Sequence, residues 1–204
     1  MKVSTFVGVG LAGVLCAVAS ADVITASYGW EDGGTILGSF GNLGSFNNAD
    51  AAFVNSGSRS LGLTEDPVGG TPQAYVAYIE GLEDGDVIDA SFFAWDDTPG
   101  QGSAFYQSIR IWAHYAVSGD VTSFNGSAGG NDTFSGDQLW TQLSNQWTFD
   151  SNGGERDALV IEVRLYSASD AEPPVGGFYV DDLEVAVTRD GALDGVTITT
   201  PVPA

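Results

Sequence analysis

The sequence is poor in three residue types that carry chemistry in many proteins: cysteine, histidine and lysine. Its 204 residues include one cysteine, one histidine and six Lys and Arg residues, against 27 Asp and Glu residues. Cys16 lies in the apparent leader described below, so the remaining chain has no thiol for a disulfide scaffold, a zinc site or a cysteine nucleophile. The formal charge of −21 argues against nucleic acid and anionic membrane surfaces as partners, because binding phosphates needs clustered Lys and Arg.

The first 21 residues have the pattern of a secretory signal peptide. Lys2 supplies the charged start, an apolar run extends from Phe6 to Val18, and small residues at 19–21 form a cleavage site before Asp22. A transmembrane anchor is the alternative, but the run contains three glycines and is shorter than the roughly 20 residues that a span needs. We therefore expect a secreted or cell-surface protein whose mature chain has no membrane span.

Glycine is abundant, with 28 residues, and clusters of Gly, Asp, Asn and Pro separate short stretches in which apolar and polar residues alternate. This alternation has the two-residue period of half-buried strands. No stretch has the pattern of a long helix, and parallel strands would need crossover helices. The sequence therefore predicts an all-β antiparallel β-sandwich, with loops at 33–48 and 118–137 and nine strands at residues 23–28, 51–54, 60–63, 74–79, 86–95, 108–117, 139–149, 158–166 and 178–187.

Three of these strands place large polar or aromatic side chains opposite their apolar stripe. The even positions of strand 86–95 and the odd positions of strand 108–117 are apolar, and strand 158–166 has its apolar stripe at odd positions too. The outward candidates are Phe93, Trp95, Arg110, Trp112, His114, Glu162, Arg164 and Tyr166. We expect the first five of these side chains to lie together on one face of the sandwich.

An exposed stripe of this composition is typical of sugar recognition. Flat rings can lie under pyranose faces, and planar polar groups can hydrogen-bond to hydroxyls. The eight residues are therefore candidates for binding a polysaccharide, and the acidic charge favours a neutral or cationic polymer over an anionic one. The alternative is that a loop or another strand covers these rings.

Five segments together resemble a known family. In chain order they are Gly29-Trp30-Glu31, residues 56–63 (SGSRSLGL), residues 81–86 (GLEDGD) leading into 91–95 (SFFAW), residues 140–143 (WTQL) and residues 177–185 (GFYVDDLEV). They resemble carbohydrate-binding modules of the family 4, 9 and 22 type, which are β-jelly rolls. The resemblance covers residues 23–187, although galactose-binding-like jelly rolls of many roles share its closing segment, which therefore indicates fold more than ligand.

The chain is therefore expected to have three parts: the signal peptide at residues 1–21, a jelly-roll domain at residues 22–188, which the resemblance implies, and a flexible tail at residues 189–204. The tail ends in Thr-Thr-Pro-Val-Pro-Ala, which is similar to the spacer before the sorting signals of many exported bacterial proteins. A secreted, monomeric bacterial protein is the expectation.

A structural calcium ion is also implied. Asp181 is expected to point inward, because it shares a strand face with Leu183, and a buried carboxylate must be neutral, hydrogen-bonded or bound to a cation. The resembling family joins this aspartate to an acidic residue near the first strand, which matches Glu31, with carbonyl ligands from the loop around Ser56 and Ser58. Backbone N–H bonds to Asp181 are the alternative.

Catalytic motifs are not evident. The sequence has no Glu-x-Asp-x-x-Glu strand motif, no Gly-x-Ser-x-Gly elbow and no His-Glu-x-x-His helix, and the lone His114 leaves little besides carboxylates as a general base. Three classes stay open: a non-catalytic polysaccharide-binding module, which we favour, an extracellular structural or adhesion protein without a sugar ligand, and a secreted glycoside hydrolase.

Overall fold

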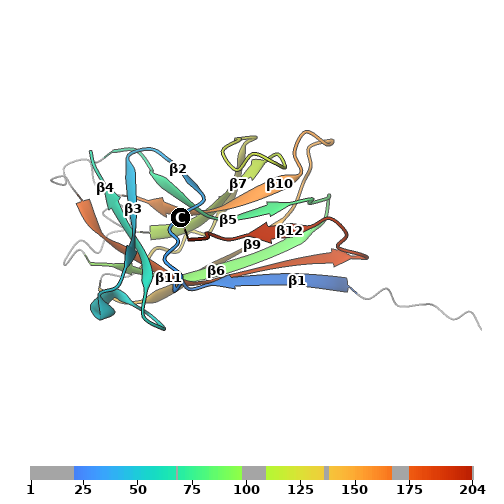
Figure 1. Ribbon diagram of the computed structural model, residues 1–204. Coiled ribbons are helices and arrows are strands. Elements are labelled where there is room, and N and C mark those ends of the chain that lie inside the picture. Colours follow the sequence, from blue (N-terminus) through green and yellow to red (C-terminus); the bar gives the residue numbers. More distant parts are fainter. Residues whose placement is uncertain (1–20, 68, 98–108, 136–137, 167–174, 204) are drawn as a thin grey trace, which may run out of the picture.

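The computed structural model describes residues 21–67, 69–97, 109–135, 138–166 and 175–203, which form two antiparallel sheets packed face to face (Figure 1). The β6 sheet has the strand order β3 (Leu43–Asn48), β4 (Ser60–Glu65), β11 (Val175–Asp190), β6 (Val87–Asp96) and β9 (Thr141–Thr148), with β1 (Ala21–Tyr28) beside β11. The β7 sheet has the order β12 (Thr197–Thr199), β5 (Gln73–Glu80), β10 (Ala158–Leu165), β7 (Ile109–Ala116) and β8 (Ser127–Gly130), with β2 (Gly38–Phe40) beside β5.

The chain crosses repeatedly between the two sheets. From β4 to β7, and again from β9 to β12, each strand lies in the sheet opposite to that of the strand before it. The antiparallel β-sandwich and the jelly roll that the sequence predicts are thus confirmed. One consequence decides the location of any site: β6 and β7 are neighbours in sequence, yet their outward side chains lie on opposite sides of the molecule.

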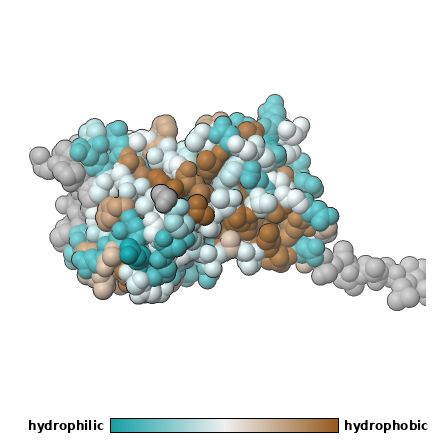
Figure 2. Space-filling view, in the orientation of Figure 1, coloured by the Kyte–Doolittle hydropathy of each residue, from teal (hydrophilic) through white to brown (hydrophobic). Residues whose placement is uncertain are grey.

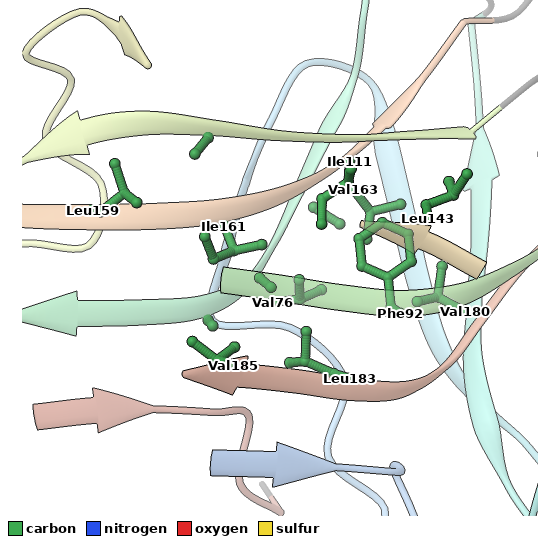
Figure 3. Packing of buried hydrophobic residues seen from close by; sticks show 14 of the residues in the cluster. Val76, Phe92, Ile111, Leu143, Leu159, Ile161, Val163, Val180, Leu183 and Val185 are labelled. Atoms are coloured by element: carbon green, nitrogen blue, oxygen red, sulfur yellow. The ribbon is translucent and has the colours of Figure 1, made fainter. Parts of the chain in front are cut away.

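The apolar stripes of the two sheets meet in one core (Figure 3). Phe92 and Leu183 come from the β6 sheet, Ile111 and Val163 come from the β7 sheet, and all four side chains are fully buried. Burying each such side chain contributes about 1.5–3 kcal/mol relative to leaving it in water. These inward positions are the ones that the alternation predicts, so the core fixes which face of each strand points outward.

Hydrophobic and hydrophilic residues are interleaved on the side of the molecule seen in Figure 2, with hydrophobic residues gathered near β1 and β12. Val23 on β1 is exposed, while Ile24 and Ile198 pack partly against the core. Within the described residues, β1 pairs only with β11 and β12 only with β5. The apolar residues on this side therefore border the edge of the core.

The predictions for residues 33–54 are wrong in two respects. The expected loop contains two strands, β2 and β3, and the expected strand at 51–54 is a single-turn 3-10 helix, η1 (Ala51–Phe53). Asp50 caps this turn, because its carboxylate accepts a hydrogen bond from the N–H of Ala52. On β3, the ring of Phe46 lies over Gly62 of β4, where an added Cβ would come within 2.2 Å of it. Only a glycine opposite leaves room for the ring.

The expected boundary at residue 188 also needs correction. β11 continues to Asp190, and β12 pairs with β5 in the β7 sheet. Val196 is buried, so part of the expected flexible tail belongs to the sandwich. The apolar content of this short strand is too small to mark it as a strand in the sequence.

β11 contains a bulge that the sequence analysis did not foresee. Asp182 has a positive φ of 50°, and the pairing with β6 shifts register between Asp181 and Glu184. Because a bulge inserts an unpaired residue, the side chains before and after it alternate out of phase. Asp181 therefore lies on the outer face together with its partner Phe93, opposite to Leu183, and the prediction that it points into the core is wrong.

Candidate functional site

The sandwich separates the eight candidate binding residues into two groups. Phe93 and Trp95 lie on the outer face of the β6 sheet. The prediction that they share a face with the outward residues of β7 is wrong, because the two strands belong to different sheets. The other six candidates lie together on the β7 sheet: Arg110, Trp112, His114, Glu162, Arg164 and Tyr166.

Arginines cover the aromatic rings on the outer face of the β7 sheet. The guanidinium carbon of Arg110 lies 4.9 Å from the ring centroid of Trp112 and 4.7 Å from that of Phe134. The guanidinium carbon of Arg164 lies 4.7 Å from the same Trp112 ring. Tyr166 completes the cluster, 5.5 Å from Phe134. Trp112 is thus held in a cation–π stack and is not a free platform for a sugar ring.

His114 is also occupied by protein contacts. Its Nδ1 lies 2.5 Å from Oε1 of Glu162, and the second oxygen of Glu162 accepts a hydrogen bond from Nε of Arg164. Both His114 and Glu162 are fully buried, and the ring of Phe124 packs against the imidazole. Phe124 comes from the segment between β7 and β8, so this segment covers His114, whereas Arg110, Trp112, Arg164 and Tyr166 stay partly exposed.

Half of the outer face of the β6 sheet is covered as well. Phe53 from η1 stacks on Tyr179 with ring centroids 4.3 Å apart, and its ring lies 6.3 Å from that of Trp95. Trp95 also contacts Trp140 at 5.8 Å. The segment that follows η1 passes over Asp181, where the N–H groups of Asn55 and Ser56 contact its carboxylate. Trp95 therefore belongs to a self-packed aromatic cluster at one end of the face.

The other half of this face is open and forms a groove of about 800 Å³. Strands β1, β11, β6 and β9 contribute its walls and floor, with small or polar side chains at the outward positions. Nε2 of Gln146 donates a hydrogen bond of 2.8 Å to Asp89, which holds both side chains on the floor. The outward polar side chains that line the groove are Thr25, Ser27, Asp89, Ser91, Gln142, Ser144, Gln146 and Glu184.

The groove has no aromatic lining residue, so the aromatic pattern of the sequence does not predict it. The signal was the polar alternation of β9, in which Gln142, Ser144 and Gln146 alternate with the buried Leu143 and the inward-facing Asn145 and Trp147 positions. Phe93 follows Ser91 on the same face of β6 and pairs with Gln142, which lines the groove. Phe93 thus lies beside the groove, next to Gln142, but is not among the residues that line it.

The residues expected to bind calcium lie around one loop but hold each other. The backbone N–H groups of Asn55 and Ser56 donate hydrogen bonds to Oδ2 of Asp181, at 2.9 and 3.1 Å. The N–H of Asp182 donates to Oδ1. On the other side of the loop, the carboxylate of Glu31 accepts hydrogen bonds from the N–H and the hydroxyl of Ser58.

These contacts match the alternative to calcium, in which backbone N–H groups donate hydrogen bonds to the carboxylate of Asp181. Calcium needs six to eight oxygen ligands, and the loop directs N–H groups at the two carboxylates. Among the described residues, no three acidic, histidine or cysteine side chains converge closely enough to hold a metal ion. The arrangement as it stands does not fit a calcium ion bound through the loop carbonyls.

Burial changes the acidity of Asp181. Desolvation raises its pKa to about 6, against the lowering effect of the N–H bonds from Ser56, Asp182 and Asn55. The pKa of Glu31 is instead lowered, mainly by the hydrogen bonds from Ser58. Of the two carboxylates, only Asp181 is costly to keep ionised.

The fold is that of a carbohydrate-binding-module jelly roll with an open groove on one sheet. No protein-family model and no curated protein matches the sequence. Among solved structures, the chain is similar to the CBM22-1 xylan-binding domain of Xyn10C from Paenibacillus barcinonensis, with a TM-score of 0.50 and 16% identity over 84% of this chain and 97% of that one. The CBM22-2 xylan-binding domain of the same protein gives 0.51 and 16% identity, over 86% and 98% of the two chains.

These likenesses concern the fold. At 16% identity they do not carry residue roles from one chain to the other. Within the described residues, no helix is long and apolar enough to cross a membrane.

Proposed function

We propose that this protein is an exported, non-catalytic module that binds a polysaccharide in the groove of the β6 sheet. The observation that carries the proposal is the groove itself: an open concavity whose outward positions are amides, hydroxyls and carboxylates. Such groups can replace the water that hydrates sugar hydroxyls, in the way that polar groups fix the orientation of ligands in other binding sites.

The dimensions of the groove suit a chain of several sugars. Four strands at a spacing of about 4.8 Å place β1 about 14 Å from β9. Phe93 has no ring contact with another described aromatic residue, so it supplies a stacking surface beside Gln142.

Support from other proteins is limited to fold and ligand class. The two similar domains named above are described as xylan-binding. Export is supported by the charged start, apolar run and small-residue site at residues 1–21. The missing catalytic motifs support a module without enzymatic activity.

Affinity electrophoresis against neutral glycans tests the proposal. Xylan, mannan and β-glucan gels should include one that retards the parent protein. Ser91→Trp, which fills the groove, and Gln142→Ala with Gln146→Ala, which removes its amides, should abolish that retardation. Thr199→Ala on β12 in the other sheet is the control and should migrate like the parent. Equal retardation of the groove variants and the parent would overturn the placement of the site.

The covered face of the β7 sheet favours one alternative function. A face whose rings stack on arginines and whose histidine is buried is suited to structure, as in an adhesion or matrix protein without a sugar ligand. A parent protein that no glycan retards supports this second candidate.

Calcium at Asp181 is a separate proposal, and it requires that the loop at Asn55 and Ser56 turn its N–H groups away from the carboxylate. The cost of an ionised, buried Asp181 supports a cation there, while the N–H groups of the loop compete with it. Adding about 1 mM calcium, a concentration at which extracellular modules bind it, is expected to raise the melting temperature by several degrees. Chelator should reverse the rise, and Asp181→Asn should be indifferent. Identical melting of the parent in calcium and in chelator would rule the ion out.

A further inference from the structure

The groove carries charge of one sign only. Its lining contains two acidic residues, Asp89 and Glu184, and no Lys, Arg or His. The arginines of the β7 sheet, Arg110 and Arg164, lie on the opposite outer face of the sandwich. No basic side chain of the groove therefore offsets the two carboxylates.

The two carboxylates lie close to each other on neighbouring strands. Asp89 of β6 pairs with Ala186 of β11, and Ser91 pairs with Glu184. Asp89 and Glu184 are therefore diagonal neighbours on the same face, about 7–8 Å apart at the backbone. Two like charges at this separation repel each other, and a positive group placed between them relieves the repulsion.

Most of their hydrogen-bonding capacity is unused. Oδ1 of Asp89 accepts the bond from Gln146, and no described residue donates to the other oxygen of Asp89 or to Glu184. Neither residue forms an ion pair within the described chain. The free acceptors face the volume that a ligand would occupy.

We infer that the groove prefers a polysaccharide whose sugars carry protonated amino groups, such as a deacetylated amino-sugar polymer, over the acetylated form of the same polymer. The inference rests on the proposed function and names its ligand class. A protonated amine donates hydrogen bonds and adds a Coulomb attraction to Asp89 and Glu184, whereas an acetylated amine keeps one donor and loses the charge. An anionic polymer meets like charge and is rejected.

The expected preference is moderate, because the carboxylates are exposed. Exposed ion pairs are individually weak and are screened by salt. Two such pairs correspond to about a fivefold to tenfold difference in dissociation constant, or about 1–1.4 kcal/mol. The preference should shrink as the salt concentration rises.

Calorimetric titration with glucosamine and N-acetylglucosamine oligomers of equal length, and with a xylan oligomer, tests the inference. The titration is run at pH about 6, where sugar amines are largely protonated. We expect the amino oligomer to bind fivefold to tenfold more tightly than its acetylated form in about 0.1 M salt, and about equally in 1 M salt.

The double variant Asp89→Asn with Glu184→Gln is expected to lose this preference, so that it binds the amino and the acetylated oligomer equally. Asp194→Asn, an exposed acid outside the groove, is the matched control and should keep the preference. Equal affinity of the parent for the two forms overturns the inference while leaving the proposed function intact. A preference that survives in the double variant also overturns it, because the net charge of the protein is then the cause. Failure of all the oligomers to bind overturns the proposed function itself.

Discussion

At the scale of single residues, Asp181 shows how burial and hydrogen bonding oppose each other. The loop that covers this carboxylate removes it from water and then supplies three backbone N–H bonds. The bonds stabilise the ionised form, yet desolvation is the larger effect and raises the pKa to about 6. The contribution of Asp181 to the free energy of unfolding therefore depends on pH.

The sign of that dependence follows from linkage. The folded protein binds the Asp181 proton more tightly than the unfolded chain, whose carboxyl has the ordinary value of 3.8. The favourable contribution of the protonated group is complete below pH about 4 and is lost as the pH rises through about 6. In chelator, lowering the pH from about 7 to about 5 should increase the free energy of unfolding by on the order of 1 kcal/mol through this group.

Urea denaturation of the parent and Asp181→Asn at several pH values measures this contribution. The variant should lack the extra slope between pH about 5 and 7. Carboxylates with lowered pKa values, such as Glu31 and Asp84, lose their stabilising effect only at lower pH, so they do not mask the result. Parallel pH profiles for the two proteins would contradict the assignment.

At the scale of elements, each outer face is governed by the strands and loops that cross it. The β7 sheet is covered by its own side chains and by Phe124, whereas the β6 sheet is covered at one end by residues after η1 and open at the other. Outward arginines and aromatic rings thus pack on one another on the β7 sheet, whereas small and polar outward side chains line a groove on the β6 sheet.

Trp112→Ala should therefore destabilise the protein without affecting glycan retention. The ring stacks with Arg110 and Arg164, and its Nε1 donates a hydrogen bond of 2.8 Å to Ser127. Losing these contacts should lower the free energy of unfolding by on the order of 2–3 kcal/mol. Chemical denaturation measures the loss, and gel retardation of the still-folded variant at low temperature checks binding. Weakened retention with unchanged stability would instead place the ligand on the β7 sheet.

Gly81→Ala should detach the strand β12 from the sandwich. Gly81 has a φ of 73°, and an added Cβ would lie 2.3 Å from the carbonyl oxygen of Gly195 in the turn before β12. Gly85 is the matched control, because it has a φ of 92° and open space around it. Gly85→Ala therefore measures the backbone strain of a positive φ without a steric clash. We expect a loss of about 1 kcal/mol for Gly85→Ala and about 3 kcal/mol for Gly81→Ala in urea denaturation. Equal losses would show that the turn does not hold β12.

At the scale of the whole molecule, charge is the dominant feature. A formal charge of −21 on 204 residues opposes compaction through self-repulsion. Three exposed acids, Asp22, Asp190 and Asp194, lie near the paired ends of β1 and β11 and the turn that follows. The folded state should therefore depend on ionic strength.

Raising the sodium chloride concentration from about 0.1 M to about 1 M shortens the Debye length from about 10 Å to about 3 Å. The melting temperature should rise as the repulsion is screened, with a smaller rise in a variant that carries Asn at positions 22, 190 and 194. Differential scanning calorimetry in sodium and choline chloride separates screening from specific ion effects, because screening is the same for both. A melting temperature that falls or stays constant with salt would refute the argument.

The sequence by itself determined the all-β class, the antiparallel sandwich and the inward faces of β6, β7 and β10, because strand alternation is local and burial of apolar groups is strong. Tertiary structure alone decided which outward faces coincide. Phe93 and Trp112 have the same local pattern, yet crossing between the sheets sends them to opposite sides.

The bulge at Asp182 likewise depends on pairing. The buried apolar positions change from even (Phe178, Val180) to odd (Leu183, Val185), but only the pairing with β6 decides that Asp181 faces outward. The groove, too, exists only where four strands meet. Sequence fixes the period of each strand, but the neighbours of a strand, and so the chemistry of a shared surface, are set by long-range contacts.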